Sequence, residues 1–325
     1  MTLSRRAFIA SAAAATTAAT LARPALAQAK LTQLNLDWAT YNPLSLIIRD
    51  NKWLEEEFKA DGIAIQWVQS AGSNKALEFL NAGSLDLGST AGAAALLGKI
   101  GGNPIKSVAV YSRPEWTALV TKGDKINSVA DLKGKSVAVT RGTDPHIFLI
   151  RALLDHKLAA SDVKFVLLQH ADGKTALVRG DVDAWAGLDP IMAQAEVDEG
   201  ARLFYRKPEN NTWGILNVRE EFAAKNPEIV KRVIGVYEKA RKHALAKPED
   251  VKAALVKAAR LPDPVIARQL TRTDFGTSII GPVQAEAIEQ AGVALQKAEV
   301  IKSDVNVKAV VAALVDSSFT SGIKS

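Results

Sequence analysis

Short apolar runs typical of β-strands alternate with longer segments of helical periodicity along most of this sequence. Between residues 31 and 110 the strand-like runs fall at 34–38, 63–68, 85–88 and 105–110. Each gap between them carries apolar residues at helical spacing. A strand–helix–strand order lays helices on the faces of a parallel sheet, because neighbouring strands are then joined by a crossover. The alternation therefore predicts an α/β protein with mostly parallel sheets.

A second series of the same kind follows. Its strand-like runs fall at 136–139, 164–168, 182–186 and 203–205. Two further extended segments, 116–120 and 213–218, stand before and after this series. From Glu220 onward helical patterns dominate, with helices expected to begin at Pro227 and Pro248 and to cover 282–297. The chain is thus predicted to hold two α/β units followed by a helical tail.

The stretch 131–154 combines a strand, a tight turn and a helix start. Val137-Ala138-Val139 is followed by Arg141-Gly142-Thr143, after which Asp144 is placed to cap a helix and Pro145 suits its first turn. Free N–H groups and the helix dipole favour negative charge at such a point, and Arg141 adds a fork of donors. The stretch is either a site for a small anion or an ordinary strand–helix connection with a surface arginine.

Two residues beside this turn allow opposite interpretations. An acidic Asp144 lowers the affinity of a helix start for a pure anion, so it either faces an ammonium group or caps the helix and points away. His146 lies one turn further on, where it either touches a ligand or packs within the protein.

Two other turns follow strands and are rich in small residues. Because strand ends gather at one edge of a sheet, we expect ligand contacts there. The expected contacts are Ser70, Gly72, Ser73, Thr90, Ala91 and Gly92. The run 88–92 is similar to the nucleophile elbow of hydrolases, but Thr90 stands at its centre, and close helix packing explains the small residues better.

Composition excludes several classes of protein. The chain has no cysteine, which removes disulfides, thiolate metal sites and a cysteine nucleophile. The four histidines show no metal-ligand spacing, so no metal or cofactor is expected. The formal net charge is +6, but three arginines lie within residues 1–27, which leaves about +3 for the remainder. This excess is too small to indicate nucleic-acid binding.

The first 27 residues have the pattern of an export signal. Arg5-Arg6 precedes an alanine-rich apolar run, and Ala25-Leu26-Ala27 is a small-residue cleavage site. The segment resembles a twin-arginine signal peptide, and cleavage is expected after Ala27. The apolar run is too short for a stable membrane span.

The remainder resembles a known family. The matching runs are 53–55, 65–68, 76–88, 180–185 and 189–190, together with INSVADLKGKSVAV over 126–139. In this order they are similar to periplasmic substrate-binding proteins of ABC importers, of the type that binds aliphatic sulfonates, taurine or nitrate. The resemblance implies a two-lobed type II periplasmic-binding-protein fold, with lobe 1 over 28–115 and 218–325 and lobe 2 with the crossover strands over 116–217.

The same resemblance implies a function and its partners. A small anionic or zwitterionic molecule, such as taurine or an alkanesulfonate, would bind between the lobes of a periplasmic monomer without catalysis. A membrane permease and an ATPase would then import it. The expected ligand contacts from the second series are Arg141, Gly142, Thr143, Asp144 and His146, completed by Asn42, Trp116, Asp189 and Trp213. Gly187-Leu188 departs from the aromatic that sulfonate binders carry ahead of the aspartate–proline pair, which leaves the ligand open.

An exported or cofactor-dependent enzyme is the alternative. A related branch of the fold synthesises the thiamine pyrimidine with iron and a cysteine-rich motif. The absence of cysteine and the export signal both count against that branch.

Overall fold

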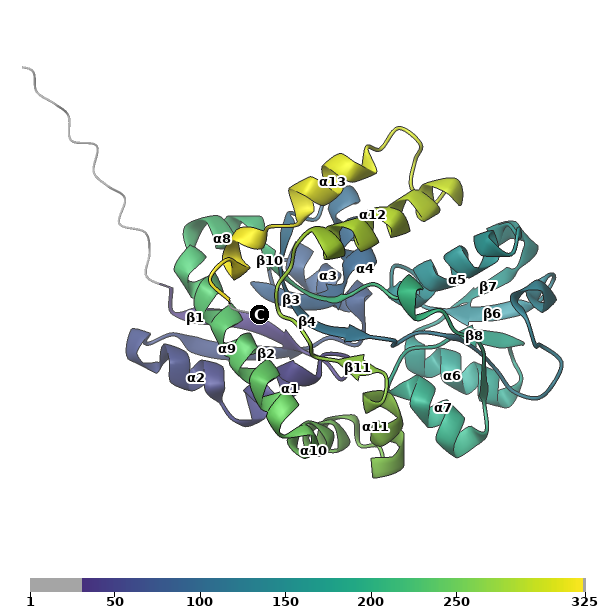
Figure 1. Ribbon diagram of the computed structural model, residues 1–325, viewed down its shortest axis with the longest axis horizontal. Coiled ribbons are helices and arrows are strands. Elements are labelled where there is room, and N and C mark those ends of the chain that lie inside the picture. Colours follow the sequence, from purple (N-terminus) through teal and green to yellow (C-terminus); the bar gives the residue numbers. More distant parts are fainter. Residues whose placement is uncertain (1–30, 324–325) are drawn as a thin grey trace, which may run out of the picture. The chain divides into compact units, whose positions relative to one another are not determined.

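The first β-sheet draws its strands from three separate parts of the sequence. The structure, a computed structural model, describes residues 31–323 and orders six strands β11-β4-β10-β3-β1-β2 (Figure 1). Their bounds are β1 Gln33–Trp38, β2 Ala64–Gln69, β3 Leu87–Ala91, β4 Ile105–Pro114, β10 Gly214–Arg219 and β11 Thr273–Asp274. The proposed signal peptide, residues 1–27, lies outside the described residues.

The second sheet is built from one continuous part of the chain. Its order is β7-β6-β8-β5-β9. The bounds are β5 Leu119–Thr121, β6 Ser136–Val139, β7 Lys164–Leu167, β8 Ala184–Ala186 and β9 Arg202–Tyr205. The two-sheet α/β architecture predicted from the alternating pattern is confirmed.

The prediction of mostly parallel sheets is confirmed for strand direction, with exceptions: among the described residues, β10 and β11 run against the other four strands of the first sheet, and β5 runs against the other four of the second. β1 runs parallel to β2 and β3, but β10 runs antiparallel to both β3 and β4. Likewise β6 is parallel to β7 and β8, whereas β5 is antiparallel to β8 and β9. The reason is the path of the chain: β10 returns from the second sheet and therefore enters the first against its neighbours.

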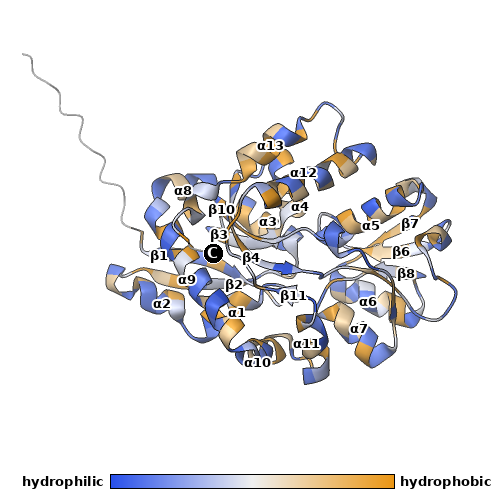
Figure 2. Cartoon of the chain, in the orientation of Figure 1, coloured by the Kyte–Doolittle hydropathy of each residue, from blue (hydrophilic) through white to orange (hydrophobic). Residues whose placement is uncertain are grey.

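Helices flank both sheets. Figure 1 shows α5, α6 and α7 grouped around β6 and β8, and Figure 2 shows blue and orange residues on the same helices, as amphipathic helices require. Their bounds are α1 Pro43–Asp50, α2 Trp53–Phe58, α3 Ser73–Asn81, α4 Gly92–Ile100, α5 Asp144–Asp155, α6 His170–Arg179, α7 Ile191–Glu199, α8 Glu220–Lys225, α9 Pro227–Ala246, α10 Pro248–Ala259, α11 Asp263–Leu270, α12 Pro282–Lys297 and α13 Val307–Leu314. The helices expected at Pro227, Pro248 and 282–297 are confirmed.

The small residues after Leu87 form a strand rather than the predicted turn. Ser89, Thr90 and Ala91 are fully buried in β3, between β1 and β10. Their hydroxyls are satisfied inside the sheet, because Ser89 Oγ donates to Asp37 Oδ2 at 2.8 Å and Thr90 Oγ1 accepts from Asn217 Nδ2 at 2.8 Å. Local composition indicates a turn here, but bonds to distant strands override it.

The predicted crossover strand 116–120 is shorter than expected. Only Leu119 and Val120 belong to β5, and Trp116 to Ala118 form a connection without strand structure. The N–H of Thr117 donates to Asn211 Oδ1 at 2.9 Å instead of to a neighbouring strand. Residues of this connection are therefore free to line the space between the two sheets.

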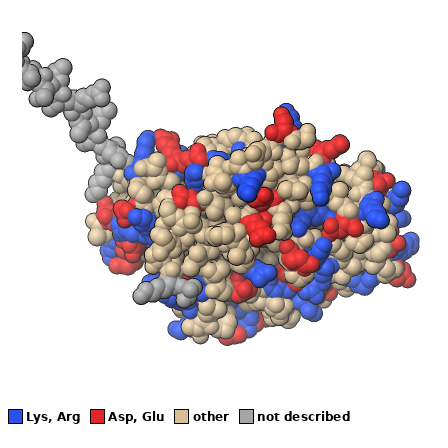
Figure 3. Space-filling model, turned by 45° about the horizontal axis from the view of Figure 1, so that its top comes forward, with Lys and Arg blue, Asp and Glu red and all other residues tan. Residues whose placement is uncertain are grey.

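The hydrophobic core is continuous from the first sheet to a helix of the second. Ile147 and Ile150 of α5 pack in one cluster with Ile288 and Leu295 of α12 and with Leu96 of α4. On the face seen in Figure 3, basic and acidic side chains of the described residues are interspersed rather than gathered by sign. None of the helices within residues 31–323 is long and apolar enough to cross a membrane.

Candidate functional site

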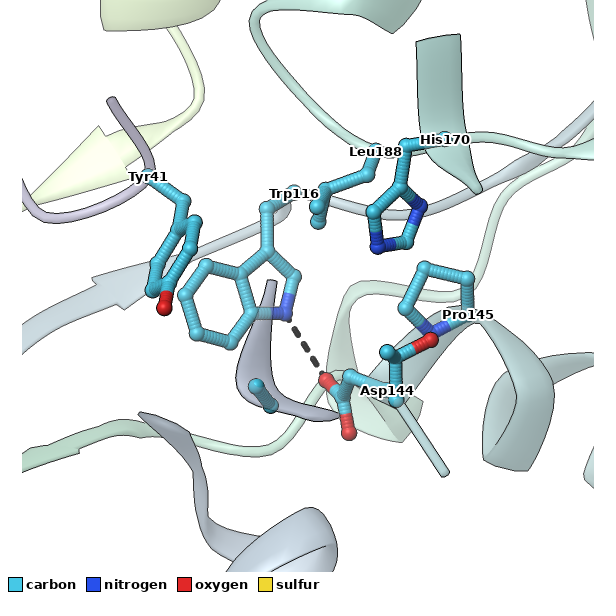
Figure 4. A pocket seen from close by; sticks show the side chains of 8 residues that line it. Tyr41, Trp116, Asp144, Pro145, His170 and Leu188 are labelled. Atoms are coloured by element: carbon cyan, nitrogen blue, oxygen red, sulfur yellow. Dashed lines mark hydrogen bonds between the residues drawn. The ribbon is translucent and has the colours of Figure 1, made fainter. Parts of the chain in front are cut away.

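Two neighbouring cavities lie where loops and helix ends of both sheets meet. The larger has a volume of about 490 Å³, and the smaller, of about 10 Å³, is drawn in Figure 4. Tyr41, His170 and Leu188 line both. The smaller cavity is also lined by Ser73, Trp116, Thr143, Asp144 and Pro145. The larger volume falls in the range of pockets that hold small molecules.

Aromatic rings form one wall of the smaller cavity. Tyr41 and Trp116 meet edge to face, with ring centroids 6.1 Å apart. The Tyr41 hydroxyl donates to the Ser89 carbonyl at 3.0 Å, and Trp116 Nε1 donates to Asp144 Oδ2 at 2.8 Å (Figure 4). Both rings are held by a hydrogen bond at their polar end, so they offer a preorganised apolar surface.

Asp144 neither caps α5 nor points away from the protein. The N-cap position belongs to Thr143, and Asp144 is the first residue of the helix. Its carboxyl is buried and accepts from Trp116 Nε1, from the Thr212 N–H at 3.0 Å and from Thr212 Oγ1 at 2.7 Å. Burial raises its pKa, against these hydrogen bonds, which lower it. With three donors already bound, Asp144 serves to join α5 to the segment before β10.

The first turns of four helices face the cavities. Ser73 begins α3, Thr143 and Asp144 begin α5, His170 begins α6, and Pro190 immediately precedes α7. Helix N-termini present free N–H groups and a positive end of the helix dipole. Two lysines, Lys75 of α3 and Lys174 of α6, also line the larger cavity. The combined field favours a negatively charged group.

Asp189 connects the larger cavity to the segment between α11 and β11. Its Oδ1 accepts from Arg272 Nη2 at 2.8 Å and from the Ala193 N–H at 2.9 Å, whereas Oδ2 has no partner among the described residues. Arg272 also pairs with Glu196 at 2.7 Å. Burial raises the pKa of Asp189 to about 7 despite the guanidinium. This buried ion pair ties α7 of the second sheet to the C-terminal part of the chain.

Six of the residues predicted from the sequence line the cavities. Besides Ser73, Trp116, Thr143 and Asp144, these are Ser70 and Asp189. The segments 70–73 and 88–92, both predicted as turns, do lie side by side. The N–H of Ala91 donates to Ser73 Oγ at 3.0 Å.

Several predicted residues have structural contacts instead. Asn42 caps α1 and reaches the Tyr237 hydroxyl at 3.3 Å, and the Trp213 carbonyl accepts from the Gly92 N–H. A Cβ on Gly92 would come within 2.7 Å of Ile288, which confirms close helix packing as the reason for the small residue. Gly142 turns the chain with φ +76°.

The two residues beside the α5 turn differ in exposure. Arg141 is exposed, makes no hydrogen bond or ion pair among the described residues, and lines neither cavity described above. His146 is buried with its ring edge-on to Phe165 at 6.0 Å, and burial lowers its pKa to about 4. Its position matches the packing alternative.

Sequence reasoning missed four residues at the centre of the site: Tyr41, Pro145, His170 and Leu188. Each lies within three residues of a helix start, which is the only local signal that could have identified them. Within residues 31–323, no group of three or more histidine or acidic side chains is arranged to hold a metal ion.

Comparison with known proteins places the chain in a class. The alkanesulfonate-binding protein SsuA of Xanthomonas axonopodis pv. citri, bound to MOPS, superposes with a TM-score of 0.80 over 89% of this chain and 99% of its own, at 24% identity. The periplasmic aliphatic sulphonate-binding protein SsuA of Escherichia coli gives 0.73 over 85% and 96%, at 26% identity. The two-sheet architecture is that of the periplasmic binding protein fold.

The sequence also identifies the family. The NMT1/THI5-like family model matches residues 58–251. A relative from Escherichia coli (strain K12), named for binding aliphatic sulfonates, is 32% identical over 244 residues, which are 74% of this chain and 75% of that protein. This chain belongs to the NMT1/THI5-like family.

Proposed function

We propose that this protein is the solute-binding component of an ABC import system. It captures a small anionic or zwitterionic organic molecule, of the sulfonate class that includes taurine and alkanesulfonates. The protein binds the ligand between its two sheets in the periplasm and delivers it to a membrane permease, which is driven by an ATPase. Relatives named for sulfonate binding support this function.

The observation that carries the proposal is the convergence of helix N-termini on the two cavities: the starts of α3, α6 and α7 line the ligand-sized one, and the start of α5 lines the smaller one beside it. Each helix start presents the positive end of a helix dipole. Lys174 adds a positive charge, and Lys75 adds one that is paired with Glu78 at 2.7 Å. Tyr41 and Trp116 supply the apolar wall for an alkyl chain. A sulfonate with a short carbon chain has this combination of an anionic head and an apolar body.

Binding without chemistry is favoured over the enzyme alternative by the state of the polar groups. Asp144 is occupied by three donors and Asp189 is paired with Arg272. Burial lowers the pKa of His170 to about 3. A general base needs a pKa near the working pH, which His170 does not have. Asp189 has a pKa of about 7, but its Oδ1 is held by Arg272 and the Ala193 N–H, a contact that joins parts of the fold.

Isothermal titration calorimetry of the purified protein tests this function. We expect taurine or a short alkanesulfonate to bind with a dissociation constant in the micromolar range or below, and nitrate or a neutral sugar to bind at least about a hundredfold more weakly. Failure of every sulfonate tested to bind would overturn the proposal.

Arg141 is proposed as a further contact of the anionic head, since its exposed guanidinium has no partner among the described residues. Charge-assisted hydrogen bonds contribute about 1.5–3 kcal/mol each, so Arg141→Ala should weaken sulfonate binding by roughly ten- to a hundredfold. Arg141→Lys should recover only part of the loss, because a point charge lacks the fork. An affinity of the alanine variant within twofold of wild type would remove Arg141 from the site.

Export through the twin-arginine route is proposed from the Arg5-Arg6 pair and the cleavage site that ends at Ala27. Replacing both arginines with lysine should leave uncleaved precursor in the cytoplasm, as judged by fractionation and mass of the product. Normal export of that variant would indicate the general secretory route.

A further inference from the structure

His170 has a buried, unpaired nitrogen beside the smaller cavity. The residue is only 3% exposed, it lines both cavities, and its Nε2 has no hydrogen-bond partner among the described residues. Figure 4 shows one ring nitrogen of His170 directed toward the space between Trp116 and Pro145. A buried polar atom without a hydrogen-bond partner costs free energy. A ligand group that can bond to this nitrogen should therefore bind more tightly than one that cannot.

The neighbouring hydrogen bonds fix which form of the ring is present. Thr140 Oγ1 lies 2.8 Å from the Leu168 carbonyl and 3.1 Å from His170 Nδ1. A carbonyl oxygen only accepts, so the single hydroxyl hydrogen of Thr140 is donated to Leu168. His170 Nδ1 must then carry the ring hydrogen and donate it to Thr140. Nε2 is left as a bare acceptor.

A second unpaired acceptor lies close by and comes from the other sheet's helices. Asn74 Oδ1, in the first turn of α3, is buried without a partner among the described residues. A Cβ on Gly72 would lie 2.8 Å from this oxygen and 3.1 Å from His170 Nε2. The two acceptors therefore flank the same point, and the missing side chain of Gly72 keeps the approach to them open.

We propose that His170 Nε2 accepts a hydrogen bond from an N–H or O–H group of the ligand, and so selects sulfonates that carry an ammonium or hydroxyl group over those with a plain alkyl chain. This inference rests on the proposed function and narrows its ligand class.

The physical basis is that leaving a buried acceptor without a hydrogen bond costs more free energy than forming the bond gains. A donor on the ligand satisfies Nε2, whereas a methyl group leaves it desolvated and unpaired, and a sulfonate oxygen at the same place would oppose one acceptor with another. Burial holds the pKa of His170 at about 3, so the ring stays neutral and Nε2 remains an acceptor at neutral pH. Thr140 acts as a positioning residue, because it sets the protonated nitrogen without facing the ligand.

Three sulfonates of similar size test the selection in the wild-type protein. Taurine, 2-hydroxyethanesulfonate and 1-propanesulfonate differ only in the terminal group, which is ammonium, hydroxyl or methyl. By titration calorimetry we expect at least one of the first two to bind ten times or more tightly than 1-propanesulfonate. Equal affinities for all three would overturn the role of His170 and leave the proposed function standing, whereas no binding of any would remove the proposed function itself.

Variants of His170 and Thr140 locate the effect. His170→Phe should reduce the preference over 1-propanesulfonate to within about twofold. The two ligands with a donor should bind more weakly, and 1-propanesulfonate more tightly, because its methyl group no longer leaves Nε2 unpaired. Thr140→Val matches threonine in shape but removes the acceptor of Nδ1, so either nitrogen can carry the hydrogen and the preference should fall by about threefold or more. Thr140→Ser keeps the hydroxyl and should keep the preference.

Two results would contradict the inference. One is that His170→Phe keeps the wild-type preference for taurine or 2-hydroxyethanesulfonate over 1-propanesulfonate. The hydrogen bond from the ligand's ammonium or hydroxyl group would then be accepted by another residue. The other is an equal loss in Thr140→Val and Thr140→Ser, which would attribute the effect to packing at this position rather than to the form of the ring. The Thr140 pair also provides the test where His170→Phe does not fold.

Discussion

Asp37 is an acid buried within the first sheet, where it is only 1% exposed. It accepts from the Ser89 N–H at 2.9 Å and from Ser89 Oγ at 2.8 Å, yet burial raises its pKa to about 7. The folded state thus binds a proton that the unfolded state has released above about pH 4. The contribution of this group to the free energy of unfolding is therefore fully present below pH 4 and falls as the pH rises to about 7.

Asp37→Asn should remove this pH dependence, because the amide is isosteric and does not titrate. Urea unfolding of both proteins between pH 5 and 8 measures the effect. The variant should gain stability relative to wild type as the pH rises, and Asp189, whose pKa is also raised to about 7, is present in both proteins. A stability difference that does not change with pH would show that Asp37 titrates outside this window.

Individual site residues were predictable only where the signal is local. The turn 141–143 and the helix start after it follow from Gly142 and Pro145. The role of Asp144 does not, because its partner Thr212 lies 68 positions further along the chain. Tyr41 and His170 were missed for the same reason: only the meeting of two sheets makes them neighbours.

At the scale of elements, close contact between helices sets the identity of small residues. Gly92 begins α4 against Ile288 of α12, and a Cβ there would lie 2.7 and 2.9 Å from two of its side-chain atoms. Gly92→Ala should therefore lower the free energy of unfolding by about 1–3 kcal/mol through overpacking.

Chemical denaturation with a matched glycine checks this. Gly235 is exposed in α9 with nothing within 4 Å of its Cβ position, so Gly235→Ala should be neutral or stabilise by up to about 1 kcal/mol. A double variant of Gly92→Ala with Ile288→Ala should lose less than the sum of the two single changes. Additive losses would mean that the two residues do not compete for the same space.

Elements with local start signals were predicted well, and those defined by pairing were not. A proline stands in the first turn of α9, α10 and α12, and all three were placed correctly. β11 has two residues and exists through its pairing with β4. The strand predicted at 85–88 is present, but its continuation to Ala91 in β3 depends on β10, which pairs with it there. No pattern within such short segments carries that information.

At the scale of the whole molecule, the cavities are lined from both sheets, so a ligand that contacts both sides should favour an arrangement in which they are close. Small-angle X-ray scattering with saturating taurine, or with the tightest sulfonate found, should give a smaller radius of gyration than the free protein. An unchanged radius, with binding shown by calorimetry in the same buffer, would indicate a rigid pocket.

The position of β10 has a consequence for how this protein can be made. The second sheet lies within 119–205 and is complete once that part of the chain has left the ribosome. The first sheet is not, because β3 and β4 pair through β10, which begins at Gly214. Until then the facing edges of β3 and β4 are unpaired, and such edges are where chains aggregate. The first strands to be synthesised therefore belong to the sheet that is completed last.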